Sequence, residues 1–238
     1  QCPESEVLLI YQSWEELRER RPVFIREDFC GTSAVAREWV KQNEANRVIG
    51  VDLDPVVLEW AQNKIDAELT EEQVSRIKLV EHDVFTAEIP PVDCTIAMNF
   101  SYYGFKRRSQ LLRYFKSVRS GLKDDGMFLL DAYGGSDSFV EMHEERDLDG
   151  FTYVWDQHTV NPITGDVLNY IHFEFPDGSK INKAFTYEWR FWTLPELQDA
   201  LVEAGFSQVV VYWEGTDEDG GGNGEWKIDT RGEACAGW

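Results

Sequence analysis

The residues in the stretch 23–54 that could do chemistry are two acids and a glycine. Glu27 follows an apolar run, Gly31 lies in a tight Cys-Gly-Thr-Ser turn, and Asp52 closes the next apolar run. Gly31 lets the backbone approach a ligand closely, and a helix that begins just after it would offer unpaired N–H groups. A carboxylate such as Asp52 can accept hydrogen bonds from both hydroxyls of a ribose. Together these residues predict a nucleoside site.

A strand, a tight turn, a helix and a second strand must position these residues, and the stretch 23–54 has that pattern. The fingerprint for NAD is absent, because Gly-x-Gly-x-x-Gly would need glycines where Phe29 and Ser33 stand. A pyrophosphate would then have no place to lie. The stretch therefore argues against a dinucleotide as the ligand.

The turn resembles the first motif of class I S-adenosylmethionine methyltransferases, which is usually acid-x-Gly-x-Gly-x-Gly. Glu27 falls on the acidic position and Gly31 on the second glycine, whereas Phe29 and Ser33 replace the first and third glycines. The segment Arg-Glu-Asp-Phe-Cys-Gly-Thr is also similar to one in a little-characterised group of plant and bacterial methyltransferases. In that group Phe and Cys are usual at the positions of Phe29 and Cys30.

The resemblance assigns a role to the polar residue that ends each of four successive predicted strands. Glu27 would balance the methionine ammonium of S-adenosylmethionine, and Asp52 would hold the ribose hydroxyls. Asp83 would accept from the adenine amino group while the Val84 N–H reaches a ring nitrogen, and Asn99 would border the methionine end. Turn residues are often polar for structural reasons alone. The cofactor-binding residues implied by the resemblance are Glu27, Phe29, Cys30, Gly31, Asp52, Leu53, Asp83, Val84, Asn99 and Phe100.

Tyr102 and Tyr103 follow the fourth predicted strand and could reach the transferred methyl group, so we expect at least one of them to orient the acceptor. His172 is a candidate general base, although a lone histidine on a strand is more often simply accommodated. No cysteine or histidine spacing suggests a metal site. The residues expected to bind the acceptor are Tyr133, Tyr170, Trp189 and Arg190.

Alternating strand and helix patterns up to residue 150 predict an α/β fold with a doubly wound, Rossmann-like methyltransferase sheet. We expect its fifth strand at 127–133, after an Asp-Asp-Gly turn, and an acidic helix at 141–149. An antiparallel β-meander of three strands follows at 151–192. It resembles the sheet inserted after the fifth strand of small-molecule N-methyltransferases, where it roofs the acceptor site.

The expected domains are therefore a cofactor-binding core at 1–150, the inserted roof at 151–192 and a return to the core at 193–238. In the last part we expect a helix, a strand at 207–215 and a mobile acidic, glycine-rich loop at 216–225. The segment 225–229 could form the antiparallel edge strand with which such a sheet normally finishes.

The formal net charge of −21 argues against a nucleic-acid substrate, because this surface repels phosphate backbones. No Lys or Arg cluster would hold a phosphate, so the predicted acceptor lacks one, and an amine is favoured over a carboxylate. No apolar run is long enough to span a membrane. The scattered cysteines suggest a reduced cytoplasmic protein but leave a Cys2–Cys235 bridge open. The start at Gln rather than Met predicts a trimmed sequence, in which a targeting segment would not be visible.

These features predict an S-adenosylmethionine-dependent methyltransferase that acts on a small-molecule acceptor and releases S-adenosylhomocysteine. Two alternatives stay open at this point. One is a protein of the same fold that binds S-adenosylmethionine or S-adenosylhomocysteine without turnover. The other is an aminopropyltransferase that uses decarboxylated S-adenosylmethionine. The oligomeric state, including a homodimer, also stays open.

Overall fold

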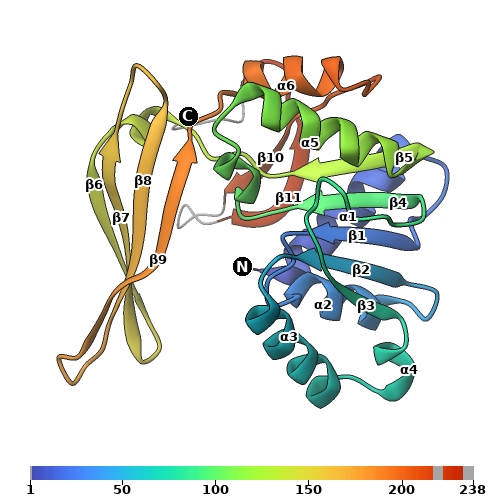
Figure 1. Ribbon diagram of the computed structural model, residues 1–238, viewed down its shortest axis with the longest axis horizontal. Helices are drawn as coiled ribbons and strands as arrows, with labels where there is room; N and C mark the ends of the chain where they lie inside the picture. Colours follow the sequence, from blue (N-terminus) through green and yellow to red (C-terminus); the bar gives the residue numbers. More distant parts are fainter. Residues whose placement is uncertain (1, 217–221, 233–238) are drawn as a thin grey trace. The chain divides into compact units, whose positions relative to one another are not determined.

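The structure is a computed structural model of the 238-residue chain and describes residues 2–216 and 222–232. These residues form two compact units (Figure 1). The first contains the described residues of 2–101, 112–131 and 201–232. The second contains 102–111 and 132–200.

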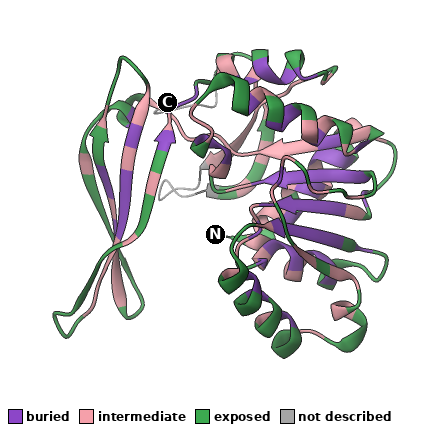
Figure 2. Cartoon of the chain, in the orientation of Figure 1, coloured by how far each residue is buried: buried purple, intermediate pink, exposed green. Residues whose placement is uncertain are grey.

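The first unit is built on a parallel five-stranded sheet with the strand order β3-β2-β1-β4-β5 (Figure 1). This confirms the predicted Rossmann-like sheet. All six residues of β4 are buried, as expected of a central parallel strand with both faces covered (Figure 2). The strands are β1 (Phe24–Asp28), β2 (Arg47–Asp52), β3 (Ile77–Glu81), β4 (Val92–Ala97) and β5 (Leu122–Leu130).

The helices of the first unit pack apolar side chains against this sheet. Trp14 and Trp39 are fully buried there, beside Ile25 of β1. Local signals fix some helix starts: Asp54 accepts hydrogen bonds from Val56 N and Val57 N and so caps α3. The helices are α1 (Pro3–Leu17), α2 (Ala34–Gln42), α3 (Pro55–Glu68) and α4 (Glu71–Val74), while α5 (Arg108–Ser120) and α6 (Leu194–Glu203) contribute residues to both units.

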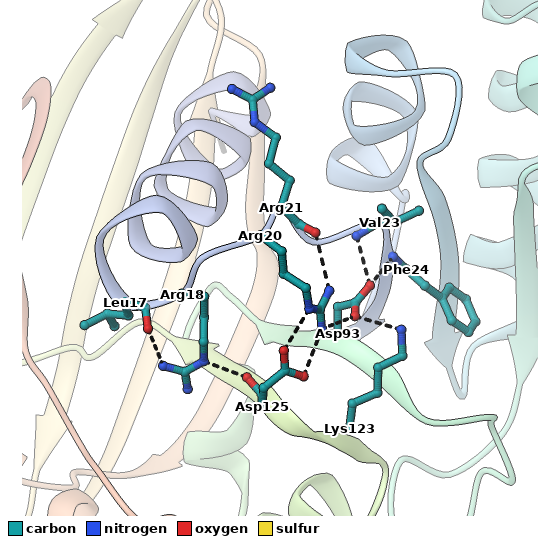
Figure 3. Close-up of polar contacts among 9 residues, drawn as sticks. All are labelled: Leu17, Arg18, Arg20, Arg21, Val23, Phe24, Asp93, Lys123 and Asp125. Carbon is teal, nitrogen blue, oxygen red and sulfur yellow. Dashed lines mark hydrogen bonds and ion pairs between the residues drawn. The ribbon is translucent and has the colours of Figure 1, made fainter.

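At the amino end of the sheet, Asp93 of β4 holds the segment that enters β1 (Figure 3). Its Oδ2 accepts hydrogen bonds from Val23 N and Phe24 N, both at 2.9 Å, and its Oδ1 lies 2.7 Å from Arg20 Nη2 and 2.8 Å from Lys123 Nζ. Burial works to raise the pKa of Asp93, but these four donors together lower it to about 2. The charge of this buried acid is therefore compensated within the protein.

The second unit contains an antiparallel sheet in the order β6-β7-β8-β9, so the predicted meander has four strands rather than three. The additional strand covers the segment predicted to be an acidic helix. Its charged pattern suits an edge strand, because six of its seven residues are exposed while the backbone pairs with β7. The elements are η1 (Ser101–Gly104), η2 (Ser136–Phe139), β6 (Met142–Leu148), β7 (Phe151–Val160), β8 (Asp166–Glu174) and β9 (Lys180–Arg190).

Three predicted boundaries in the first unit were wrong, and one of them belongs to the strand expected at 207–215, which begins only at Tyr212. β5 begins at Leu122 and includes the Asp-Asp-Gly segment expected to be a turn, because a shift in register between Val92 and Cys94 absorbs it. Residues 222–225 belong to β11 (Gly222–Ile228), whereas 217–221 of the predicted loop lie outside the described residues.

The predicted strand at 225–229 falls largely within β11 but does not extend the five-stranded sheet. It pairs with β10 (Tyr212–Thr216) in a two-stranded antiparallel sheet. Cys235 of the bridge left open above lies outside the described residues. In the described part of the chain, no helix is long and apolar enough to cross a membrane.

Candidate functional site

In the turn after β1, the backbone has a positive φ angle at all three positions where the methyltransferase motif usually has glycine. Phe29, Gly31 and Ser33 have φ angles of 56°, 48° and 54°. Only glycine adopts this left-handed region readily, and each other residue there costs on the order of 1–2 kcal/mol. Strain of this kind persists where the surroundings impose it, and it clusters at functional sites. The backbone of the predicted motif is thus retained although two of its glycines are not.

Asp52, at the end of β2, fastens this turn. Its Oδ2 accepts a hydrogen bond of 2.8 Å from Gly31 N, and its Oδ1 accepts one of 3.0 Å from Asp54 N. The carboxylate is partly exposed, and each oxygen has a further lone pair with which to accept from a ribose hydroxyl. Leu53 is 66% exposed, so its side chain is accessible to a ligand. Both residues are thus accessible at the end of β2, and their contacts with a nucleoside stay a prediction.

Glu27, at the end of β1, is a buried acid with a strongly raised pKa. It is 5% exposed, and its Oε2 accepts a hydrogen bond of 3.1 Å from Ala36 N of α2. Burial, with the nearby charges of Glu6 and Asp52, raises the pKa of Glu27 to about 8. A cationic ligand group beside Glu27 would favour its ionised form, so this carboxyl suits the ammonium of a methionine moiety.

The segment after β3 is held in a tight turn. Asp83 Oδ1 accepts a hydrogen bond of 2.9 Å from Phe85 N, and the backbone N–H of His82 donates to Asp52 O at 2.9 Å. Val84 is buried, and its carbonyl accepts a hydrogen bond of 2.9 Å from Arg26 Nη2. The predicted adenine-binding residues therefore lie on a segment that hydrogen bonds connect to β2 and β1.

Asn99 and Phe100, after β4, form a second strained turn with φ angles of 58° and 56°. Their N–H groups donate to the carboxylate of Asp131 at 2.7 and 2.9 Å. These bonds lower the pKa of Asp131, but burial outweighs them and raises it to about 6. Asp131 was not predicted from the sequence, although an acid directly after the apolar end of β5 repeats the pattern seen at Glu27 and Asp52.

Cys30 lines the turn and is not an activated thiol. It is buried, and burial raises its pKa well above the ordinary value. Its Sγ lies so close to Gly50 of β2 that a Cβ there would be 2.9 Å away. Glycine at position 50 thus allows the turn and β2 to pack together.

Tyr102 and Tyr103 lie in η1 and are both fully buried. The hydroxyl of Tyr103 is within hydrogen-bond distance of two carbonyl oxygens, 2.9 Å from Tyr133 O and 3.1 Å from Trp192 O. These contacts give Tyr103 a part in holding the second unit together. A role for either tyrosine in orienting an acceptor remains a prediction.

The residues predicted to contact the acceptor divide between the two faces of the meander. The Trp189 ring lies 6.0 Å from that of Tyr133 and 6.2 Å from that of Trp155. Tyr170 lies on the opposite face, because it pairs with Thr186, and odd and even positions of β9 alternate between faces. We call the face of Tyr133, Trp155, Tyr187 and Trp189 the aromatic face. The predicted set is therefore not a single cluster.

His172 shares the face of Tyr170 and belongs to a cluster around the buried Asp156. Its Nε2 lies 3.3 Å from Asp156 Oδ2, and its Nδ1 accepts a hydrogen bond of 3.2 Å from Lys183 N. His143 Nε2 and His158 Nδ1 lie 3.2 and 3.7 Å from the same carboxylate. Within the described ranges, no group of three or more His, Cys, Asp or Glu residues could hold a metal ion.

Arg190 is engaged within the second unit. Its guanidinium lies 3.2 Å from Glu196 Oε1, and its Cζ is 3.8 Å from the centre of the Trp192 ring. Nη1 also donates to Lys106 O at 3.4 Å. This arrangement gives Arg190 a structural role, and its predicted contact with an acceptor remains untested.

Sequence and structure comparisons show which known proteins this chain is similar to. Residues 28–126 match the family model described as a methyltransferase domain. Together with the solved structures below, this match confirms the predicted resemblance to S-adenosylmethionine-dependent methyltransferases. No functionally curated protein matches the chain significantly.

Several solved methyltransferases share the fold of nearly the whole chain. A S-adenosylmethionine-dependent methyltransferase from Clostridium acetobutylicum is 19% identical with a TM-score of 0.66, covering 90% of this chain and 82% of its own. An amino pentose methyltransferase from Micromonospora echinaspora, involved in calicheamicin biosynthesis, is 14% identical with a TM-score of 0.70, covering 90% and 87%. A sugar N-methyltransferase from Streptoalloteichus is 16% identical with a TM-score of 0.64, covering 90% and 82%. The chain thus has the fold of S-adenosylmethionine-dependent methyltransferases, with the β-meander after the fifth strand.

Proposed function

We propose that the chain is an S-adenosylmethionine-dependent methyltransferase that acts on a small-molecule acceptor, with an amine favoured. The observation that carries this proposal is the strained turn at Phe29, Gly31 and Ser33, fastened by Asp52. Such a turn allows a nucleoside to approach the backbone closely. Glu27 lies beside the turn, and its raised pKa suits a site where a bound cation would favour the ionised carboxylate. S-adenosylmethionine carries both a nucleoside and a methionine ammonium.

The residues of the strand ends would bind and orient this cofactor. Glu27 ionises to balance the ammonium, Asp52 accepts from the ribose hydroxyls, and Asp83 and the Val84 N–H read the adenine. Asn99 and Phe100 border the methionine end. S-adenosylmethionine supplies an already activated methyl group, so the remaining work of the protein is to align the acceptor and exclude water.

The aromatic face of the meander suits an acceptor amine. Aromatic rings attract cations through their faces, and the rings of Trp189, Tyr187 and Trp155 lie within 6.2 Å of one another. Amino-sugar methyltransferases among the structural neighbours support a nitrogen acceptor. On this proposal Trp189 and Tyr133 contact the acceptor, whereas Tyr170 and His172 on the other face do not. The net charge of −21 supports an acceptor that is neither a nucleic acid nor a phosphate ester, and the scattered cysteines favour a cytoplasmic enzyme.

Calorimetric titration with S-adenosylmethionine and S-adenosylhomocysteine tests the cofactor. The variant Asp52→Ala should lose roughly 2–4 kcal/mol of affinity, because two charge-assisted bonds to the ribose disappear. The matched control is Asp66→Ala, which removes an exposed carboxylate from α3 and should bind as wild type does. Equal affinities for wild type and a folded Asp52→Ala variant would remove Asp52 from the site.

Methyl transfer across a panel of amines and amino sugars then tests turnover. The rate should rise with pH, because only the free base of an amine attacks the methyl group. A productive acceptor that is phosphorylated, or activity that falls steadily from acid to alkaline pH in the folded protein, would contradict the proposal. Cofactor binding without transfer would favour a binding protein, and reaction with decarboxylated S-adenosylmethionine would favour an aminopropyltransferase.

A further inference from the structure

Two charged residues of the predicted cofactor motif have no part in the function described so far. Arg26 and Asp28 flank Glu27 on β1, and they are only 3% and 1% exposed. Because residues alternate along a strand, they lie on the opposite face of the sheet from Glu27. Glu27 contacts Ala36 of α2, whereas Asp28 contacts Tyr114 of α5.

Arg26, Asp28 and Tyr114 form a buried polar network. Arg26 Nε lies 2.6 Å from Asp28 Oδ1, and the Tyr114 hydroxyl donates to Asp28 Oδ2 at 2.9 Å. Burial raises the pKa of Asp28 to about 6, although both partners act to lower it. Apolar residues of similar volume would often stabilise a core as well as a buried ion pair does. Stability alone therefore does not explain this network.

The network reaches the segment predicted to bind adenine. Arg26 Nη2 donates to Val84 O at 2.9 Å. The Ser117 hydroxyl of α5 is within hydrogen-bond distance of the same carbonyl, at 3.4 Å, and of Phe85 O, at 3.1 Å. The Arg26 side chain thus spans from the strand that carries the motif turn to the turn after β3.

The Tyr114 ring adds apolar contacts to the same two segments. Its centroid lies 5.6 Å from that of Phe29, in the motif turn, and 6.2 Å from that of Phe85, beside Val84. One side chain of α5 therefore touches both segments by its ring and binds Asp28 by its hydroxyl. The position of Val84 relative to the motif turn depends on this group of residues.

We propose that Arg26 and Asp28 are positioning residues that fix Val84 for recognition of the adenine base and so determine base specificity. This inference rests on the proposed function. Adenine presents an acceptor at N1 and a donor at its 6-amino group, which match the Val84 N–H and the Asp83 carboxylate. Hypoxanthine presents N1–H and a 6-oxo group, so each contact becomes repulsive. Discrimination between the two bases therefore requires Val84 to be held in place.

The test compares S-adenosylhomocysteine with S-inosylhomocysteine, its 6-oxo analogue, by calorimetric titration. The double variant Arg26→Met/Asp28→Leu removes both charges and leaves neither unpaired. It should weaken S-adenosylhomocysteine binding about tenfold or more, whereas its affinity for the analogue should change little, so the ratio between the ligands shrinks by about tenfold. Tyr114→Phe removes only one hydroxyl of the network and should reduce the ratio of the two affinities less. If the double variant does not fold, Tyr114→Phe alone tests whether the network sets this ratio.

Asp93→Ala serves as the control, because it disrupts a buried charge network at the other end of the sheet. It should lower stability without changing the ratio. A folded double variant, or a folded Tyr114→Phe variant, that keeps the wild-type ratio would overturn the inference while leaving cofactor binding intact. Failure of the wild-type protein to bind S-adenosylhomocysteine would instead overturn the proposed function.

Discussion

The two ends of the parallel sheet treat buried acids in opposite ways. At the amino end, Asp93 has two cations and two backbone N–H groups around it, and its pKa is lowered to about 2 (Figure 3). At the carboxyl end, burial raises the pKa of Glu27 to about 8 and that of Asp131 to about 6. Both ends belong to one sheet, so the difference does not come from burial alone. At the amino end the two cations and two backbone N–H groups around Asp93 outweigh burial, whereas at the carboxyl end burial outweighs even the Arg26 partner of Asp28.

The backbone shows the same contrast. Four of the five non-glycine residues described with positive φ are Phe29, Ser33, Asn99 and Phe100, all in turns at the carboxyl end. Buried acids of raised pKa and strained turns both lower stability, and they coincide where parallel sheets bind ligands. The amino end thus compensates its buried charge, whereas the carboxyl end combines the buried acids and strained turns to which the proposed function assigns a cationic nucleoside.

The largest effect on stability should come from Asp93→Ala. We expect the free energy of unfolding to fall by about 3 kcal/mol, because Arg20, Lys123 and two backbone N–H groups lose their acceptor. Its pKa is lowered in the folded state, so the contribution of Asp93 is complete above about pH 4 and is lost as the pH falls towards 2. Urea denaturation measures the change. If Asp93→Ala also lowered the affinity for S-adenosylhomocysteine, the two ends of the sheet would not have the separate roles described here.

A smaller effect is expected from Asp131→Ala, with stability lowered by about 2 kcal/mol and cofactor affinity by about tenfold. The N–H groups of Asn99 and Phe100 lose their shared acceptor, which frees the strained turn to relax. Denaturation and calorimetry measure the two quantities, and unchanged affinity in the folded variant would exclude this turn from the site.

The pH dependence of Asp131→Asn sharpens this prediction. Because the folded-state pKa of Asp131 is raised from 3.8 to about 6, the native state binds more protons than the unfolded state between these values. The contribution of Asp131 is therefore present below about pH 4 and declines as the pH rises through 6. Asp131→Asn should remove that decline, and an identical pH profile for both proteins would argue against it.

The smallest effect should come from Ser33→Gly, which we expect to stabilise the fold by about 1 kcal/mol because glycine adopts the left-handed conformation without strain. Ser33→Ala is the matched control, since it removes the hydroxyl but retains the strain. Thermal unfolding compares the two variants. Equal melting temperatures would mean that the turn stores no strain at this position.

The alternating pattern of strands and helices was enough to predict the parallel sheet, and the acids that end its strands marked the positions of Glu27 and Asp52. Pairing between segments that are distant in the sequence was harder to predict. Strand β6 has a charged sequence that local reasoning assigns to a helix, and only its pairing with β7 makes it a strand. The role of Asp131 depends on a turn 31–32 residues earlier in the chain.

The arrangement of the residues expected to contact the acceptor was the least predictable, because the faces of a meander follow from its register. Tyr170 and Trp189 are both aromatic residues on neighbouring strands, yet the pairing of Tyr170 with Thr186 places them on opposite faces. Composition alone does not distinguish them. The network of Arg26 and Asp28 could not be predicted either, because its partners Tyr114 and Val84 lie far away in the sequence.

Proton release on binding S-adenosylmethionine tests the central claim most directly. Near pH 7 the carboxyl of Glu27, with its pKa of about 8, is mostly protonated, and the ammonium of the ligand would favour its ionised form. Calorimetric titration in phosphate and in Tris should therefore give different binding enthalpies that correspond to release of about one proton, and Glu27→Gln should abolish the difference. Binding with the same enthalpy in both buffers would contradict the account of the carboxyl end.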